Sequence, residues 1–347
     1  MRESPAKPRG PRLRQLGLRI GHLEAGASDS IADVGVRVGH VTIWRDEPEP
    51  PEGRGVSRTG VTVIVPSSLP LPAGVAVLNG AGELTGSHEI REWGLLGTAI
   101  YLTATMAVGR IYDGAVSVAL AADPRIGVED VVIPVVGECD DSHLSEARVV
   151  QVEAADAGRA VAAATGWPFD EGSVGAGTGM SCLGWKGGIG SASRVAEGHT
   201  VGVLVLANFG SAHQLRFAGV PVGELLPGSG RSKPAGSCIA VVATDAALSA
   251  ASLERLARRA GLGLARTGSV AHHGSGEIFL GFSTARGGDE VGGRKLDPIF
   301  AAAVDATEEA VLNALWAAPD VEGRGGRLER GLPHDEVLEQ LRARRVL

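Results

Sequence analysis

Two segments of opposite character meet in the stretch Lys233-Pro-Ala-Gly-Ser-Cys-Ile-Ala-Val-Val-Ala-Thr-Asp245. Residues 226–236 are rich in proline, glycine and serine, which is typical of an exposed, mobile loop. The residues from Cys238 to Ala243 are apolar at successive positions, which predicts a strand that is buried on both faces. Ser237 lies at the junction between this loop and this strand.

Two interpretations of Ser237 follow from its position. If the backbone were cleaved between Gly236 and Ser237, the serine would carry a hydroxyl nucleophile and a free α-amine at the start of a core strand. An α-amine has a pKa of about 7.7–8.0, so it can accept a proton near neutral pH. Without cleavage, Ser237 is a polar residue where a turn meets a strand. By pattern alone this second case is the commoner one.

The composition is that of a globular protein, with 347 residues, 44% hydrophobic and 21% charged. Only 4% of the residues are aromatic and 51 are glycine, so we expect a core of small aliphatic side chains. The net charge of −7, without a long basic stretch, argues against nucleic-acid binding. No apolar run reaches the roughly 18 residues of a membrane-spanning helix, so we expect no membrane association.

Three cysteines, Cys139, Cys182 and Cys238, are widely spaced and odd in number. They predict free, buried thiols in a reducing compartment and hence a cytoplasmic protein. The first residues lack the apolar core of a secretion signal and carry five basic side chains: Arg2, Lys7, Arg9, Arg12 and Arg14. We therefore expect a disordered basic leader over residues 1–27 and a single domain over residues 28–347.

Strands and helices are mixed along the chain without regular alternation, which favours an α+β fold with helices packed on strand layers. The hydrophobic patterns predict strands over residues 31–43, 131–136, 199–209 and 277–283. They predict helices over residues 103–122, 145–165, 249–266 and 298–317.

Two features argue against a nucleotide or a metal. The glycine-rich stretch at residues 172–179 has Met180 where a dinucleotide-binding loop needs its third glycine, so it predicts a close backbone approach instead. His272 and His273 are adjacent and would point in opposite directions on a strand, and the run from His88 to Glu92 lacks the second histidine of a zinc motif. We therefore expect no metal site and no cofactor.

Polar side chains near strand ends are the better candidates for chemistry. Ser275 and Glu277 are two residues apart, so at the start of a strand both point to one face, where a hydroxyl backed by a carboxylate can polarise a second hydroxyl or amine. Asn208 ends an apolar strand and could donate to a developing oxyanion. Glu138 and Asp140 could bind a substrate ammonium. Each of these residues also has a plain structural interpretation as a loop or strand-end residue.

Several short motifs combine in a characteristic order over about residues 28–318. They are Ile31-Ala-Asp-Val-Gly-Val-Arg-Val-Gly-His40, Thr59-Gly-Val-Thr62, Asn79-Gly-Ala-Gly-Glu-Leu-Thr-Gly86, Gly172-Ser-Val-Gly-Ala-Gly-Thr-Gly179, Lys186-Gly-Gly-Ile-Gly190, Ala207-Asn-Phe-Gly210, Gly236-Ser237 and Ser275-Gly-Glu-Ile-Phe-Leu280. Together they resemble the DmpA/β-aminopeptidase family, the self-processing serine aminopeptidases of peptidase family S58.

This resemblance implies a four-layer αββα sandwich similar to the N-terminal nucleophile hydrolases but with different connectivity. It implies autocleavage between Gly236 and Ser237, which would divide the catalytic domain into residues 28–236 and 237–347, and a homo-oligomer of these αβ units. By the same resemblance Ser237 is the nucleophile, Ser275 and Glu277 support it, and Asn208 belongs to the oxyanion hole.

One position departs from the family pattern. Some members carry a tyrosine within Glu-Thr-Tyr-Asp, whereas this chain has Glu138-Cys-Asp-Asp141, so Asp140 takes the place of the tyrosine. The expected function is a metal-free serine aminopeptidase or amidase acting on small peptides, amides or esters through an acyl-enzyme on Ser237. The preference for α-, β- or D-residues stays open. The alternatives are an unprocessed, inactive binding or assembly protein, or an acyltransferase similar to the ornithine acetyltransferases, which carry threonine at the junction.

Overall fold

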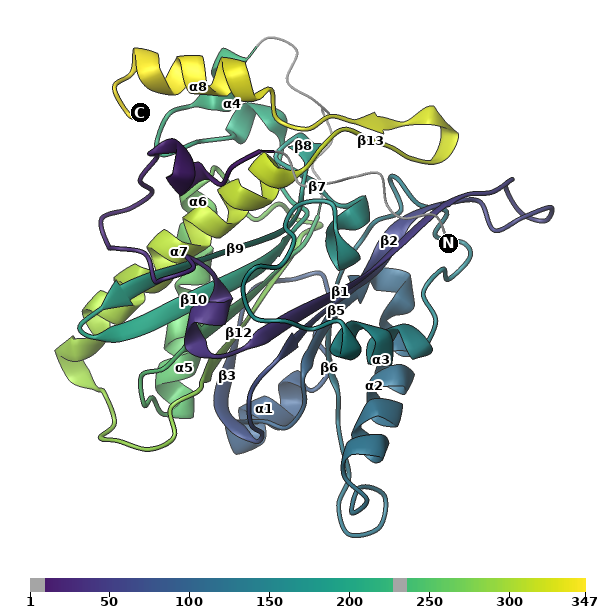
Figure 1. Ribbon diagram of the computed structural model, residues 1–347, viewed down its shortest axis with the longest axis vertical. Coiled ribbons are helices and arrows are strands. Elements are labelled where there is room, and N and C mark those ends of the chain that lie inside the picture. Colours follow the sequence, from purple (N-terminus) through teal and green to yellow (C-terminus); the bar gives the residue numbers. More distant parts are fainter. Residues whose placement is uncertain (1–9, 227–235) are drawn as a thin grey trace.

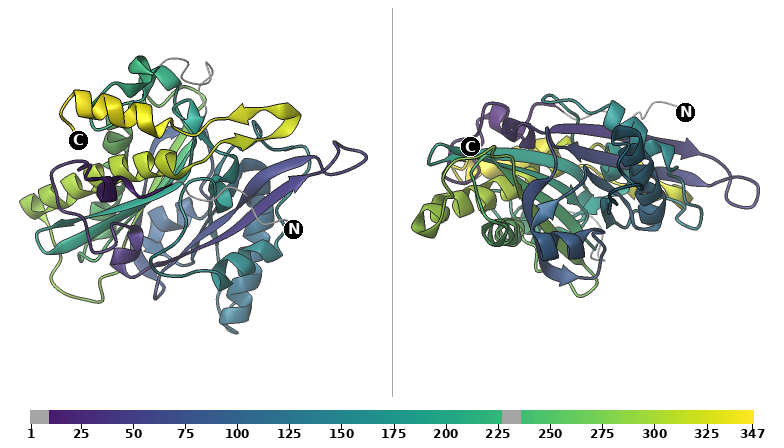
Figure 2. Two further views of the ribbon diagram at one scale, coloured as in Figure 1. Left: turned by 45° about the horizontal axis from the view of Figure 1, so that its top comes forward. Right: turned by 90° about the horizontal axis from the view of Figure 1, so that it is seen from below.

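Two β-sheets packed face to face form the centre of the computed structural model, which describes residues 10–226 and 236–347. Helices cover the outer face of each sheet, so the layers follow the order αββα (Figure 1). Figure 2 shows the same layers from two further directions. The α+β class and the sandwich expected from the sequence are confirmed.

The smaller sheet has four strands in the order β1-β2-β5-β6. The strands are β1 (Arg37–Asp46), β2 (Val56–Val65), β5 (Ile100–Ala104) and β6 (Val135–Cys139). Only β5 and β6 run parallel, so their carboxyl ends lie at the same edge. Helices α2 (Val108–Ala122) and α3 (Ala155–Ala162) cover the outer face of this sheet.

The larger sheet has six strands in the order β4-β3-β12-β11-β10-β9. They are β3 (Leu71–Gly80), β4 (Leu95–Leu96), β9 (Gly188–Ala196), β10 (His199–Ala207), β11 (Cys238–Thr244) and β12 (Gly276–Ser283). Every residue of β11 is buried, which confirms the strand predicted after Ser237. Helices α5 (Ala250–Arg258), α6 (Ala260–Arg266) and α7 (Leu296–Ala317) lie on its outer face.

The remaining elements are short. They are α1 (Ser87–Trp93), α4 (Val222–Leu225), α8 (His334–Ala343), β7 (Ser181–Cys182), β8 (Trp185–Lys186), β13 (Val321–Glu322) and β14 (Leu328–Glu329). None of the helices in the described parts of the chain combines the length and apolar character that crossing a bilayer requires.

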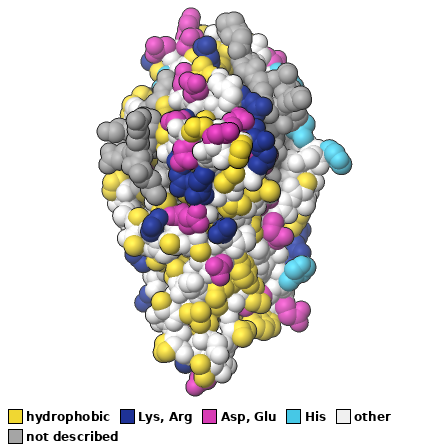
Figure 3. All heavy atoms as spheres, turned by 90° about the vertical axis from the view of Figure 1, so that its right-hand side faces the viewer, with side chains coloured by type: hydrophobic (Ala, Val, Ile, Leu, Met, Phe, Trp, Pro, Cys, Tyr) yellow, Lys and Arg dark blue, Asp and Glu magenta, His cyan; other side chains and the backbone are white. Residues whose placement is uncertain are grey.

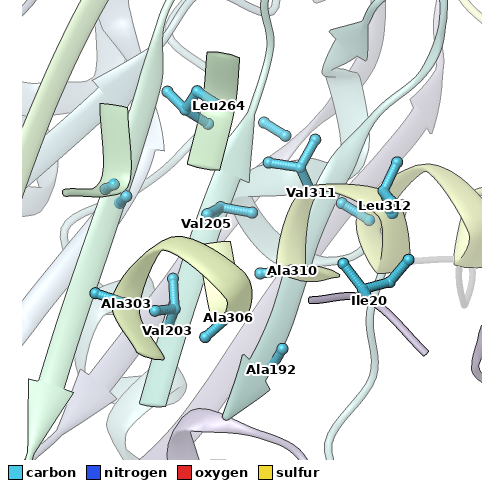
Figure 4. Packing of buried hydrophobic residues seen from close by; sticks show 14 of the residues in the cluster. Ile20, Ala192, Val203, Val205, Leu264, Ala303, Ala306, Ala310, Val311 and Leu312 are labelled. Atoms are coloured by element: carbon cyan, nitrogen blue, oxygen red, sulfur yellow. The ribbon is translucent and has the colours of Figure 1, made fainter. Parts of the chain in front are cut away.

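Small aliphatic side chains fill the layer between the larger sheet and α7, as the composition predicted. Figure 4 shows this packing, with labelled residues from β9, β10, α7 and the N-terminal segment: Ala192, Val203, Val205, Ala303, Ala306, Ala310 and Ile20. The helix approaches β9 so closely that a Cβ at Gly190 would lie 2.0 Å from the carbonyl oxygen of Ala310. Glycine is therefore required at this position.

Several predicted elements are wrong in their extent. The strand predicted over 131–136 begins only at Val135, as β6, and the helix predicted over 249–266 is divided at Arg259 into α5 and α6. Residues 31–34 form a 3-10 helix rather than the beginning of β1, because Gly35 adopts a left-handed conformation (φ 80°) and ends the helix there. The helix predicted from residue 103 begins at 108, because the apolar run before it pairs with β2 and β6 as β5. The helix predicted over 145–165 is confined to α3. The loop predicted at 226–236 falls almost wholly on residues 227–235, which lie outside the described residues.

The predicted disordered leader is wrong for residues 10–27, and residues 1–9 lie outside the described part of the chain. Leu13, Leu18 and Ile20 are buried in the same hydrophobic cluster as α7. The basic side chains are paired rather than solvated: Arg12 contacts Glu171 at 2.8 Å, and Arg14 contacts Glu309 at 3.3 Å. The segment therefore packs on the domain through buried apolar side chains, and its arginines are paired with carboxylates there.

Candidate active site

Strand register brings the predicted site residues together. Strand β11 begins directly after Ser237 and runs parallel to β12, with Cys238 opposite Glu277. Strand β10 runs antiparallel to β11, with Ala207 opposite Cys238, so Asn208 follows at the same edge. The carboxyl ends of β5 and β6 supply Thr105 and Glu138 from the facing sheet. The site therefore lies between the two sheets at one end of the sandwich.

Ser237, Ser275 and Glu277 form a buried hydrogen-bonded chain. The backbone N–H of Ser237 donates to Ser275 Oγ at 3.0 Å, and the Ser275 hydroxyl donates to Glu277 Oε1 in a short hydrogen bond. Burial raises the pKa of the Glu277 carboxyl, and hydrogen bonds from Ser275 and Asn79 oppose that shift. The nitrogen that would become an α-amine thus already faces a hydroxyl that a carboxylate orients.

The side chain of Asn208 lies on the other side of the Gly236–Ser237 peptide. Its Nδ2 donates to the carbonyl oxygen of Gly236 at 2.8 Å and to that of Asp140 at 2.9 Å. Its Oδ1 accepts from the backbone N–H of Ser181 at 2.9 Å, which fixes the orientation of the amide. A donor is therefore already in place where negative charge would develop on the Gly236 carbonyl.

Ser237 has an unusual backbone conformation. Its φ angle is 93°, within the region that L-residues other than glycine rarely adopt. Such a conformation costs on the order of 1–3 kcal/mol, and it persists only where the surroundings impose it. Here the contacts of Asn208 and Ser275 hold the peptide on both sides, so the strain is concentrated at the junction.

A cavity of about 690 Å³ opens in front of Ser237. Glu138 lies in its wall and is only 3% exposed; its carboxylate accepts from the backbone N–H of Glu83 at 2.9 Å and from the Thr105 hydroxyl in a short hydrogen bond. Burial raises the pKa of Glu138, and these two hydrogen bonds oppose the shift. Asp140 is exposed and its carboxylate binds Ser142 instead, with both contacts at 2.9 Å.

Comparisons with known proteins show the family of the chain. A family model for peptidase family S58 matches residues 29–329. The chain belongs to this family.

This S58 peptidase is similar to characterised relatives over almost its whole length. It is 39% identical to a β-peptidyl aminopeptidase, BapA, from Sphingosinicella microcystinivorans, over 99% of this chain and 94% of that protein. Among solved structures, a β-aminopeptidase from Burkholderia sp. has a TM-score of 0.87 at 43% identity, covering 96% of this chain and 99% of that one.

A second solved structure gives the fold its relation to other hydrolases. The L-aminopeptidase D-Ala-esterase/amidase from Ochrobactrum anthropi has a TM-score of 0.90 at 36% identity, covering 97% of this chain and 100% of that one. It is described as a new variant of the N-terminal nucleophile hydrolase fold. The fold of this S58 peptidase is therefore similar to a variant of the N-terminal nucleophile hydrolase fold, as the resemblance of the sequence motifs predicted.

Sequence reasoning missed three contributors to the site. Thr105 was assigned to a predicted helix, whereas in the structure it directly follows β5. Gly82 forms part of the cavity wall, where a Cβ would lie 3.1 Å from Glu138 Oε1. The glycine-rich turn after residue 79 is a signal that could have suggested this close approach. Ser181 acts through its backbone N–H, which no sequence pattern can reveal.

The cysteines of this S58 peptidase are free and buried, as predicted. Burial raises the pKa of Cys182 to about 12, and it raises the pKa of Cys139 and of Cys238 well above the ordinary range. All three are therefore protonated thiols at neutral pH, and none is an activated nucleophile.

Proposed function

We propose that this S58 peptidase is a self-processing serine aminopeptidase or amidase. It releases N-terminal residues from small peptides, amides or esters through an acyl-enzyme on Ser237. The observation that carries the proposal is the double contact of one peptide group, with Asn208 Nδ2 on the Gly236 carbonyl oxygen and Ser275 Oγ on the Ser237 nitrogen. The homologous β-peptidyl aminopeptidases and the L-aminopeptidase support the same activity.

In the self-cleavage step, Ser237 Oγ attacks the carbonyl carbon of Gly236. The C–N bond to Ser237 breaks, the hydroxyl proton passes to the departing nitrogen, and an ester joins Gly236 to Ser237 Oγ. Asn208 Nδ2 stabilises the oxyanion that forms on the way. Water then hydrolyses the ester, which leaves a carboxylate on Gly236 and a free α-amine on Ser237.

In turnover, the freed α-amine acts as the base for its own hydroxyl. Ser275 and Glu277 orient this amine through the hydrogen-bonded chain described above. The hydroxyl attacks the substrate carbonyl, Asn208 stabilises the oxyanion, and the protonated amine returns its proton to the leaving amine. Water hydrolyses the acyl-enzyme. Glu138, and at the cavity rim Asp140, would bind the ammonium of the substrate's N-terminus.

We also infer a cytoplasmic homo-oligomer in which residues 28–347 form one catalytic domain divided at Gly236–Ser237. The three free cysteines suit a reducing compartment.

Hydrophobic side chains gather on the lower half of the face in Figure 3. An apolar groove of about 540 Å³ beside α2 is lined by Leu69, Trp93, Val118, Val131 and Ile133, and Val131 is 75% exposed. A second copy of the chain would cover this surface, and light scattering of the purified protein tests the inference.

The intact mass of the purified protein under denaturing conditions tests the proposed function. We expect two species that match residues 1–236 and 237–347. Ser237→Ala should give one uncleaved, inactive species, whereas Ser237→Cys keeps a nucleophile and should process slowly. A wild-type protein that stays intact on long incubation and hydrolyses no amide would overturn the proposal in favour of a binding role. Transfer of the acyl group to an added amine in place of hydrolysis would favour an acyltransferase.

A further inference from the structure

Lys186 is a buried cation that the proposed mechanism does not use. It lies at the end of β8 and is fully buried. Its ammonium donates to three backbone carbonyl oxygens, those of Gly177 at 3.0 Å, Met180 at 2.7 Å and Gly187 at 2.9 Å. All three N–H donors of the ammonium are thus used by backbone carbonyl oxygens, which offsets much of the cost of burying the charge.

One of these contacts leads directly to the candidate oxyanion donor. The carbonyl of Met180 and the N–H of Ser181 are the two ends of a single peptide group. Lys186 Nζ binds the oxygen end of this group, and its N–H end donates to Asn208 Oδ1 at 2.9 Å. Asn208 Nδ2 in turn donates to the Gly236 carbonyl oxygen. Two amide groups in series therefore connect the buried ammonium to the peptide at the cleavage junction.

This arrangement has an electronic consequence. A positive charge at an amide oxygen draws electron density from the nitrogen, so the N–H becomes a stronger donor, and hydrogen bonds in a chain strengthen one another in this way. The polarised Ser181 N–H in turn polarises the side-chain amide of Asn208 through Oδ1. The Asn208 N–H groups therefore also become stronger hydrogen-bond donors. The contact also holds the Asn208 amide with its nitrogen facing Gly236.

We propose that Lys186 is a positioning residue for the oxyanion donor, acting through the Met180–Ser181 peptide and the side-chain amide of Asn208. The inference rests on the proposed function, because it assigns Lys186 a part in the same two reactions. It predicts that the effect of Lys186 on the reaction requires Asn208. A lysine that merely stabilised the fold would act equally with or without Asn208.

The charge of Lys186 gives a second readout. Burial lowers the pKa of Lys186 to about 7; Glu329 of β14 and Cys182 of β7 face it, and the Glu329 carboxylate opposes the shift. The ammonium is therefore present below about pH 7 and is lost as the pH rises above it. If the charged form strengthens Asn208, kcat acquires an alkaline limb in that range.

A double-mutant cycle tests the inference, with the rate of self-cleavage followed by intact mass and with kcat and KM measured on the processed protein. Loss of a whole oxyanion donor costs about 10²–10³ in rate, so we expect Lys186→Met to lower both rates by about tenfold with KM little changed. In the Asn208→Ala background, the same substitution should change both rates by less than about twofold. Equal losses in the two backgrounds would overturn the inference.

The pH profile provides the second arm. Lys186→Met should lack the alkaline limb, whereas Lys186→Arg keeps a cation and should retain more of the rate. Glu329→Gln leaves the lysine in place but removes the charge that supports its ammonium, so the limb should move to lower pH. If Lys186→Met does not fold, the pH profile of Glu329→Gln still tests the inference. An alkaline limb at the same pH as in the wild type would overturn it. A wild-type protein without self-cleavage would instead overturn the proposed function, which is a different result.

Discussion

Asn208 Nδ2 lies 2.8 Å from the carbonyl oxygen of Gly236, the carbonyl that directly precedes Ser237. The contact arises because β10 ends and β11 begins at the same edge of the larger sheet. The donor therefore faces the junction peptide before any cleavage. In the proposed mechanism, a substrate carbonyl that replaces Gly236 after self-cleavage would meet the same donor.

Removing this donor is expected to slow both reactions. Asn208→Ala should lower kcat by about 10²–10³, because one preorganised donor to the oxyanion is lost. Asn208→Asp is the matched variant, since it keeps the shape but replaces the N–H donors with an acceptor. Self-cleavage followed by mass spectrometry, and release of p-nitroaniline from amino-acid anilides, measure the two effects. A kcat close to that of wild type in Asn208→Ala would contradict the assignment.

Glu138 is expected to select substrates with a free N-terminus. Its carboxylate is buried in the cavity wall, so a substrate ammonium would form a largely desolvated ion pair with it. Glu138→Gln should raise KM for such substrates by roughly 10-fold to 100-fold, since charge-assisted hydrogen bonds contribute about 1.5–3 kcal/mol. The comparison is KM for an unblocked anilide in each variant. Asp140→Asn should change KM much less, because that carboxylate is exposed and already binds Ser142. The reverse order of effects would move the ammonium site to Asp140.

Asp141 is expected to make stability depend on pH. Its side chain is buried, Oδ2 has no hydrogen-bond partner among the described residues, and burial raises its pKa to about 7. The folded state therefore holds a proton that the unfolded state has already released, so stability falls as the pH rises from about 4 to about 7.

Substituting the carboxyl should remove this dependence. Between about pH 5 and about pH 8, we expect Asp141→Asn to gain on the order of 2 kcal/mol in unfolding free energy relative to its parent. Urea denaturation in the Ser237→Ala background keeps a single chain and allows the measurement. An Asp141→Asn difference that does not change with pH would show that Asp141 stays ionised.

Ile20 is expected to be part of the core although it lies in a basic segment. Its side chain is buried against the cluster that includes α7 (Figure 4). Ile20→Ala should lower the unfolding free energy by about 2–5 kcal/mol, because a cavity remains after truncation. Arg19→Ala is the control: its ion pair with Glu24 is exposed, and such pairs contribute about 0–1 kcal/mol. If the two substitutions had equally small effects on the unfolding free energy, the segment would not be part of the core, and the prediction of a separate leader would stand.

Part of this site could be predicted from local sequence because its signals are local. The buried strand from Cys238 follows from a run of apolar residues, and Ser237 is marked by the abrupt change in composition before that run. Ser275 and Glu277 share a face because side chains alternate along a strand. The motif order also predicted the family and the layered fold.

Other parts depend on contacts between distant segments. In the sequence alone, Arg12 and Arg14 suggest a solvated leader. Only the tertiary structure shows that they pair with Glu171 and Glu309. Thr105 was assigned to a helix because an apolar run has no unique period, and only pairing with β2 and β6 makes residues 100–104 a strand. Lys186 carries no catalytic signal, since its connection to Asn208 runs through a backbone peptide.

The sequence by itself determined the chemistry that is available: a serine before a buried strand, a serine and a carboxylate two residues apart, and an asparagine at a strand end. Only the tertiary structure decided that these groups meet. The parallel pairing of β11 with β12 places Ser275 beside the Ser237 nitrogen, and the antiparallel pairing with β10 places Asn208 at the Gly236 carbonyl. The physical reason is that strand register is set by packing of the whole sheet, so residues 28 and 38 positions apart come within hydrogen-bonding distance.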